Sequence, residues 1–160
     1  MSTDQVTVTA GVREAFALDR FWDRHWARII DNQPPPVRDH LQAERALVGR
    51  QLDAAAYRTV VEAGCADGTL LLPEVVGRGL VYLGLDLASG AVREARNRLA
   101  SAGVPPAGSR VVRADVQHLP SLVAAGPPLV APALVAFPFN VFGNLDAPPA
   151  ALTAAAQVQA

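Results

Sequence analysis

The chain has 160 residues, a length that suits one domain with a sizeable core. Its net charge is −1 and its pI is about 6.3, and it has no basic patch that would indicate a nucleic-acid partner. Cys65 is the only cysteine, which excludes an intrachain disulfide and favours a cytoplasmic protein. No apolar run reaches the roughly 18 residues of a membrane span, so no membrane association is expected.

The first part of the chain predicts two helices, over residues 12–32 and 37–56, separated by the prolines at 34–36. We interpret residues 1–56 as an N-terminal cap or lid. Residues 57–160 then alternate between strands and helices. The expected strands are 59–62, 80–86, 110–115 and 133–137, and the expected helices are 68–76, 89–102, 119–125 and 149–158.

Right-handed crossovers between these elements predict an α/β fold, a Rossmann-like parallel sheet with helices on both faces. The last helix is rich in alanine and has few large side chains. We therefore expect it to cover little of the sheet.

A glycine-bearing turn follows the first expected strand, in the pattern Glu62-x-Gly64-x-Ala66-x-Gly68. Glycine has no Cβ, so a ligand can approach the backbone of this turn closely. The helix that follows directs free N–H groups toward whatever binds there. The turn therefore predicts a ligand site.

Polar side chains fall at or just past the ends of all four expected strands. They are Glu62, Asp86, Asp115 and Asn140. In parallel α/β sheets, ligands bind beyond the carboxyl ends of the strands. The alternative interpretation is that the three acids are solvated strand ends without a common role.

The turn does not match a dinucleotide site. Counting from Gly64, that fingerprint requires glycines where Ala66 and Thr69 stand, and no phosphate loop ending in Gly-Lys-Ser/Thr is present. The turn instead resembles the first motif of class I S-adenosylmethionine-dependent methyltransferases, which is usually Asp/Glu-x-Gly-x-Gly-x-Gly. Ala66 replaces the middle glycine. The resemblance covers about residues 37–145.

The resemblance implies S-adenosyl-L-methionine as the cofactor and strand order 3-2-1-4, a truncated form of the family's seven-stranded sheet. It places Asp86 at the ribose hydroxyls, Asp115 near the adenine amino group, and Leu87 and Val116 beside the adenine ring. Pro138 belongs to the motif that lines the transferred methyl group. The complete set of expected cofactor-binding residues is Glu62, Gly64, Cys65, Ala66, Gly68, Asp86, Leu87, Asp115, Val116 and Pro138.

The chemistry of the cofactor agrees with this set. S-adenosylmethionine carries an ammonium and a sulfonium group and no phosphate, so carboxylates suit it better than they suit a nucleotide phosphate.

Two further residues are candidates for a role in catalysis. Asn140 follows the fourth strand and could orient a nucleophile, or it could simply cap a turn. His25 could act as a general base, or it could be a surface residue of the first helix. Methyl transfer often needs only alignment of the nucleophile. No cluster of His, Cys, Asp or Glu has metal-ligand spacing, so no metal is expected.

The fourth strand is apolar and would form an open edge of this short sheet. Such an edge predicts pairing with another chain, as a homodimer or a hetero-oligomer, unless the chain is a truncated form of a longer protein. We expect a methyltransferase acting on a small molecule, and the alanine, proline and arginine bias suggests bacterial biosynthesis. The alternatives are a non-catalytic cofactor-binding or scaffolding subunit, and a methyltransferase fold that serves another reaction such as cyclisation.

Overall fold

The computed structural model describes residues 33–103, 106–139, 141, 145 and 147–159. The helix expected over residues 12–32 lies outside them. The described elements are α3 (Pro35–Ala54), β1 (Thr59–Ala63), α4 (Leu72–Gly77), β2 (Val81–Asp86), α5 (Ser89–Ser101), β3 (Arg110–Arg113), a 3-10 turn η1 (Val116–His118), α6 (Leu119–Ala125), β4 (Ala133–Ala136) and α7 (Pro148–Gln159).

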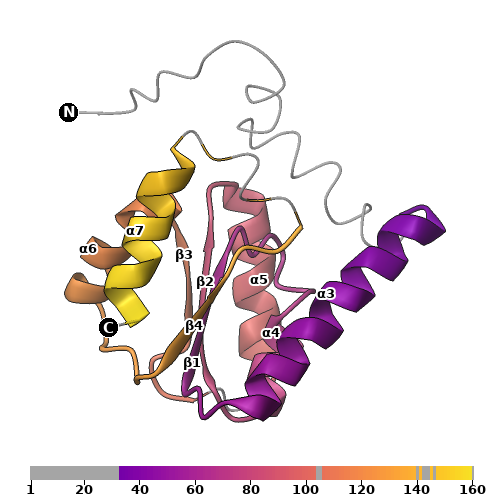
Figure 1. The fold of residues 1–160 in the computed structure, drawn as a ribbon, viewed down its shortest axis with the longest axis horizontal. Coiled ribbons are helices and arrows are strands. Elements are labelled where there is room, and N and C mark those ends of the chain that lie inside the picture. Colours follow the sequence, from indigo (N-terminus) through magenta and orange to yellow (C-terminus); the bar gives the residue numbers. More distant parts are fainter. Residues whose placement is uncertain (1–32, 104–105, 140, 142–144, 146, 160) are drawn as a thin grey trace.

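The four strands form one parallel sheet in the order β3-β2-β1-β4 (Figure 1). This confirms the predicted fold class and strand order. The register aligns Ala63 of β1 with Leu85 of β2, and Glu62 of β1 with Ala136 of β4. The carboxyl ends of all four strands therefore meet at one edge of the sheet.

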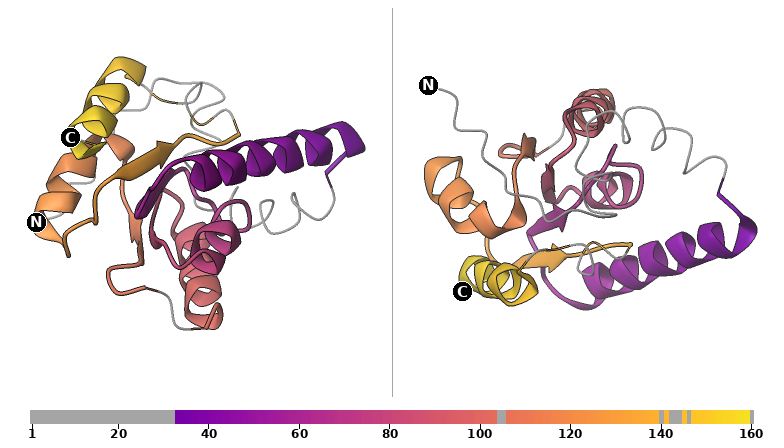
Figure 2. Two further views of the ribbon diagram at one scale, coloured as in Figure 1. Left: turned by 60° about the horizontal axis from the view of Figure 1, so that its bottom comes forward. Right: turned by 90° about the horizontal axis from the view of Figure 1, so that it is seen from above.

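Side chains alternate between the two faces of the sheet and create two apolar cores. Val60 and Tyr82 belong to the core under α3, α4 and α5, whereas Val61 and Leu83 belong to the core under η1, α6 and α7. Figure 2 shows these two sets of helices on opposite sides of the sheet. The two central strands, β1 and β2, are buried along almost their whole length, as near-continuous apolar runs predict.

Two helix starts differ from the expected ones by more than one residue. α3 begins at Pro35 because a proline in the first turn gives up no helical hydrogen bond. α4 begins at Leu72 rather than at Gly68, because Gly68 has a φ of 77° and the Asp67 carboxylate accepts the N–H of Thr69 at 3.0 Å. Pro73 then lies in the first turn of α4, where it does not kink the helix.

The alanine-rich α7 covers more of the sheet than expected. Ala151 and Ala154, one helical turn apart, are buried in the second core beside Leu119 and Val116. Small side chains allow the helix axis to approach its neighbours closely. The expectation that a helix with few large side chains would cover little was therefore wrong.

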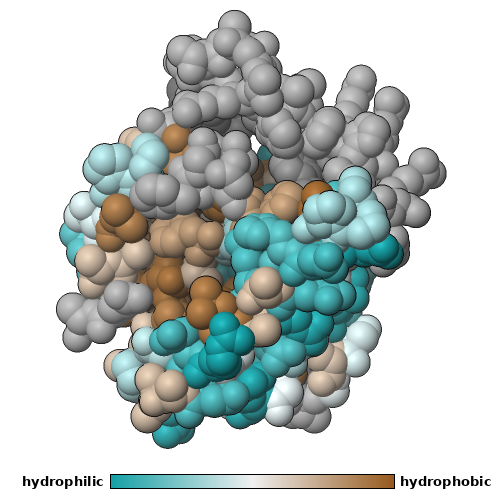
Figure 3. Space-filling model, turned by 45° about the vertical axis from the view of Figure 1, so that its right-hand side comes forward, coloured by the Kyte–Doolittle hydropathy of each residue, from teal (hydrophilic) through white to brown (hydrophobic). Residues whose placement is uncertain are grey.

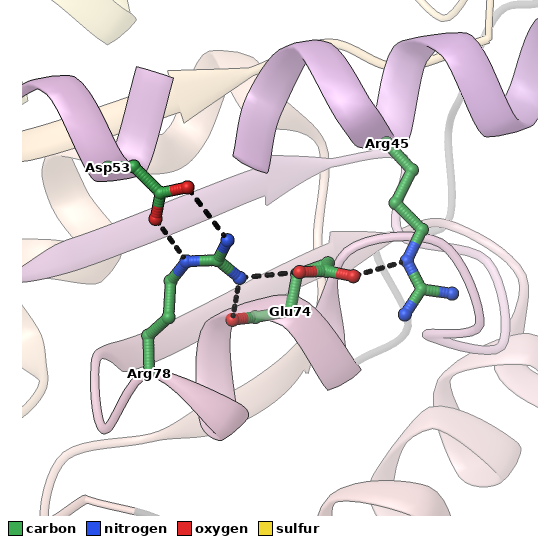
Figure 4. Close-up of polar contacts among 4 residues, drawn as sticks. All are labelled: Arg45, Asp53, Glu74 and Arg78. Atoms are coloured by element: carbon green, nitrogen blue, oxygen red, sulfur yellow. Dashed lines mark hydrogen bonds and ion pairs between the residues drawn. The ribbon is translucent and has the colours of Figure 1, made fainter. Parts of the chain in front are cut away.

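α3 lies against α4 and the first core. Leu52 is buried in that core and Val48 packs against it. Glu74 of α4 accepts a hydrogen bond from the Arg45 Nε at 2.7 Å and also pairs with Arg78, whose Nε donates to Asp53 at 3.0 Å (Figure 4). These ion pairs join α3 to α4 on the outside of the apolar contact.

β4 is an edge strand in the part of the sheet that the structure describes. Its residues after Ala133 are only half-buried, and Val130, just before it, is 42% exposed. In Figure 3, apolar side chains gather on the surface beside a broad hydrophilic area. The open edge predicted from the sequence is thus present among the described residues.

Candidate functional site

The glycine turn after β1 uses the left-handed backbone region three times. Gly64, Ala66 and Gly68 have φ values of 75°, 47° and 77°. The N–H groups of Gly64 and Cys65 both donate to the C=O of Leu85, at 2.7 and 2.9 Å, and this holds the turn on the end of β2. Ala66 stands where the resembled motif has glycine, and its backbone keeps the glycine-like conformation at the cost of strain.

Asp86 links the glycine turn to the start of α5. Its Oδ2 accepts the N–H of Ala66 at 2.8 Å, and its Oδ1 accepts the N–H of Ala88 at 2.9 Å. Burial raises the pKa of this carboxyl, and backbone hydrogen bonds from Ala88, Ala66 and Leu87 oppose that rise. Each carboxylate oxygen has a second lone pair, so Asp86 can still accept ligand hydroxyls.

Glu62 lies beneath the turn and is only 1% exposed. The hydroxyl of Tyr82 donates to its Oε2 at 2.5 Å. Burial raises the pKa of Glu62 to about 8, with smaller contributions from the negative charges of Asp67 and Asp86. Glu62 therefore supports the turn from inside the core, and its direct contact with a cofactor stays a prediction.

Cys65 is also buried, at 2% exposure, in the core beside Tyr82. Burial raises the pKa of its thiol well above the ordinary value, with the Glu62 carboxylate adding to the effect. A thiol that stays protonated and enclosed is a poor nucleophile. The missing Cβ of Gly84 makes room for this thiol, since a Cβ there would lie 2.9 Å from the Cys65 Sγ.

Asp67 and Arg98 hold the second half of the turn, and sequence reasoning missed both. The Arg98 Nε donates to the C=O of Asp67 and its Nη2 to the Asp67 carboxylate, both at 3.1 Å. That carboxylate also accepts from the N–H and the hydroxyl of Thr69. The Asp-Gly-Thr sequence is typical of such a side-chain turn and could have indicated Asp67, whereas nothing local indicated Arg98.

The residues assigned to the adenine lie at the ends of β2 and β3. Leu87 is 55% exposed and presents apolar surface there, whereas Val116 is 5% exposed and packs in the second core. Asp115 caps η1, because its Oδ1 accepts the N–H of Gln117 at 2.9 Å. Asp115 thus has a structural role, and its place near the adenine amino group stays a prediction.

The loop after β4 lies over the glycine turn. Pro138 is buried, and Phe139 has a φ of 46° with its N–H shared between both carboxylate oxygens of Glu44, each at 3.1 Å. A Cβ on Gly64 would lie 2.4 Å from the Cγ2 of Val141, so only glycine fits under this loop. The candidate catalytic residues Asn140 and His25 lie outside the described residues.

The expected cofactor residues that can be placed thus gather at one edge of the sheet. Gly64, Ala66 and Asp86 are joined by the hydrogen bonds above, and the ends of β3 and β4 flank them. Within the described ranges, no group of three or more His, Cys, Asp or Glu side chains could hold a metal ion. Nor does any helix there combine the length and the apolar character that a membrane crossing requires.

The chain resembles solved structures of methyltransferases. One is the plantazolicin methyltransferase BamL in complex with a triazolic desmethylPZN analog and SAH, with a TM-score of 0.58 and 14% identity over 92% of this chain and 54% of that one. Another is the magnesium protoporphyrin IX methyltransferase ChlM from Synechocystis PCC 6803 with bound SAH, with a TM-score of 0.50 and 24% identity over 66% and 51%. No family model matches the chain, and no curated protein matches it.

These similarities define the class of the fold. The described sheet and its helices have the Rossmann-like fold of class I S-adenosylmethionine-dependent methyltransferases. The chain spans about half the length of these solved structures, 54% of one and 51% of the other.

Proposed function

We propose that this chain binds S-adenosyl-L-methionine and takes part in the transfer of its methyl group to a small molecule. The observation that carries the proposal is the Asp86 carboxylate, which is hydrogen-bonded to the glycine turn and to the start of α5 at the carboxyl edge of the sheet. Both solved neighbours have SAH bound and act as methyltransferases.

The residues present suit this cofactor. Gly64 and Gly68 give the turn the positive φ values of 75° and 77°, which residues with a Cβ rarely adopt. The carboxylates of Asp86 and Asp115, at the ends of β2 and β3, suit a ligand with two positive charges and two ribose hydroxyls. Among the described residues, Arg98 is the only basic side chain that donates a hydrogen bond into the turn. Its donors go to the backbone and the carboxylate of Asp67.

The proposed reaction needs little from the protein beyond placement. S-adenosylmethionine supplies an electrophilic methyl group on its sulfonium. Asp86 would hold the ribose, the glycine turn would leave space for the methionine part, and Leu87 would cover the adenine. The loop that contains Phe139 would border the acceptor side and exclude water, so that alignment provides most of the rate.

The finer parts of the proposal are the small-molecule acceptor, a role in bacterial biosynthesis, a cytoplasmic location and association through the β4 edge. They are supported by the near-neutral charge, by the composition, and by neighbours that act on plantazolicin and magnesium protoporphyrin IX.

Calorimetry with SAH tests cofactor binding directly, because it needs no acceptor. We expect the wild-type chain to bind, and Asp86→Ala to bind more than tenfold more weakly, since a carboxylate that accepts several hydrogen bonds is lost. Glu94→Ala, which removes an exposed carboxylate on α5, should bind like the wild type. No binding by the wild type would refute the proposal.

A second function is a non-catalytic, cofactor-binding subunit of a methyltransferase complex. The position of β4 at the edge of the described sheet, where a second chain could pair, favours it. SAH binding without methyl transfer to any offered acceptor, and transfer restored by a partner chain, would support this alternative.

A further inference from the structure

Glu44 makes a contact that the proposed function does not use. It lies on α3, and both oxygens of its carboxylate accept the backbone N–H of Phe139, 95 residues further along the chain, at 3.1 Å each. The contact joins a helix of the N-terminal part to the loop after β4. That loop borders the proposed site, so a bond that fixes it can affect the reaction.

Phe139 has a conformation that needs such support. Its φ of 46° lies in the left-handed region, which a bulky residue rarely adopts. Strained residues of this kind persist when the surrounding structure holds them, and they cluster at functional sites. A charge-assisted hydrogen bond to the N–H of the strained residue itself supplies this support.

The loop is also fixed on its other side. Val141 lies against Gly64, where a Cβ would be 2.4 Å from the Val141 Cγ2. A displacement of Phe139 would therefore move Val141 relative to the glycine turn. Glu44 is thus linked to the glycine turn through two contacts, its hydrogen bond to Phe139 and the packing of Val141 on Gly64.

His40 completes this cluster one turn earlier on α3. Its Nε2 lies 3.4 Å from the Glu44 Oε1, and its ring centroid lies 6.3 Å from that of Phe139. His40 therefore approaches both partners of the Glu44–Phe139 hydrogen bond. Its side chain is 59% exposed, so we assign it a supporting contact only.

We propose that Glu44 is a positioning residue, whose carboxylate fixes Phe139 so that Val141 seats against Gly64 and the loop borders the glycine turn. This role rests on the proposed function, because its consequence is tighter cofactor binding. It assigns to α3 a part in forming the site, in addition to its packing on the core.

The test compares Glu44→Ala and Glu44→Gln with the wild type. Two quantities are measured: the hydrogen-exchange rate of the Phe139 amide by NMR, and the SAH affinity by calorimetry. Glu44→Ala should exchange at least tenfold faster and bind SAH roughly tenfold more weakly, because it lacks the acceptor. Glu44→Gln keeps a side-chain oxygen and should stay within about threefold of the wild type in affinity.

Asp39→Ala is the matched control, since Asp39 is an exposed acid on the same helix. It should change neither quantity. Far-UV circular dichroism identifies a variant that fails to fold. Glu44→Gln then carries the comparison, because its neutral oxygen accepts a weaker hydrogen bond and its Phe139 amide should exchange about threefold faster than in the wild type, whereas an unchanged rate would overturn the positioning role. Wild-type affinity and wild-type Phe139 exchange in a folded Glu44→Ala would overturn the positioning role alone, whereas a wild type that binds no SAH would overturn the proposed function as well.

Discussion

At the scale of single residues, Ala66 is the place where the chain departs from the motif it resembles. Its φ of 47° is unfavourable for any residue with a Cβ. The position is 7% exposed and its N–H is bonded to Asp86, so the surroundings hold the conformation in place. The strain is thus concentrated where the proposed ligand would approach.

Replacing this residue by glycine should relieve the strain. We expect Ala66→Gly to raise the free energy of unfolding by about 1 kcal/mol, because the left-handed penalty exceeds the added flexibility of the unfolded chain. Urea denaturation measures the change. The control is Ala46→Gly on the exposed face of α3, which should lower stability by about 1 kcal/mol. A loss of stability in both variants would contradict the argument.

The raised pKa of Glu62 predicts how the stability of the protein depends on pH. Its pKa is about 8 in the folded protein and 4.5 in its ordinary state. Between these values the folded state keeps a proton that the unfolded state has lost, so stability falls as the pH rises from 5 to 8. The raised pKa of Asp86 acts in the same direction.

The variant Glu62→Gln should remove part of this dependence. We expect the wild type to lose on the order of 1–3 kcal/mol between pH 5 and pH 8, and the variant to lose less, since glutamine does not ionise. Chemical denaturation at several pH values measures both slopes. Equal slopes in the two proteins would show that folding does not raise the pKa of Glu62.

At the scale of elements, the ion pairs between α3 and α4 give the opposite dependence. The hydrogen bonds from Arg78 and then Arg45 lower the pKa of Glu74. A lowered pKa contributes stability above the unfolded pKa of 4.5, and this contribution is lost as the pH falls through the folded value.

Removing the Glu74 charge should therefore weaken the attachment of α3 to α4 and lower the stability of the protein. We expect Glu74→Gln to lower the free energy of unfolding by about 1 kcal/mol at pH 7 and by less at pH 3, because these pairs are partly exposed. Glu94→Gln is the control, since its pair with Arg93 is more exposed and should contribute little. An effect of Glu74→Gln that stays constant down to pH 3 would contradict the ion-pair explanation.

The sequence predicted elements well where the signal was local. Apolar runs gave β1 and β2 within one residue, and the resemblance gave the strand order. Prediction from the sequence failed where a group far along the chain determines the position of a side chain. Glu62 is buried because Tyr82 reaches it from β2, and Glu44 bonds to Phe139 across 95 residues. The late start of α4 has a local cause, the Asp67 turn, which a closer reading of Asp-Gly-Thr would have found.

At the scale of the whole molecule, β4 leaves backbone groups unpaired at the edge of the described sheet. The C=O of Pro132 accepts the N–H of Arg58 at 2.9 Å, so Pro132 faces β1. Successive strand residues alternate in direction. Leu134 and Ala136 therefore also face β1, and the N–H of Val135 points to the open edge.

This direction makes a specific test of association possible. If a second copy pairs with the β4 edge, sedimentation should give about twice the 16.8 kDa of one chain. Val135→Pro removes an N–H that β1 does not use, so the sheet should persist while the association is lost. Val135→Ala, which trims the same side chain and keeps the N–H, should still associate, and a thermal melt checks that both variants fold. A wild type that stays at 16.8 kDa at every concentration would exclude pairing between copies, and the edge would then have to be covered by a different chain or by a further segment.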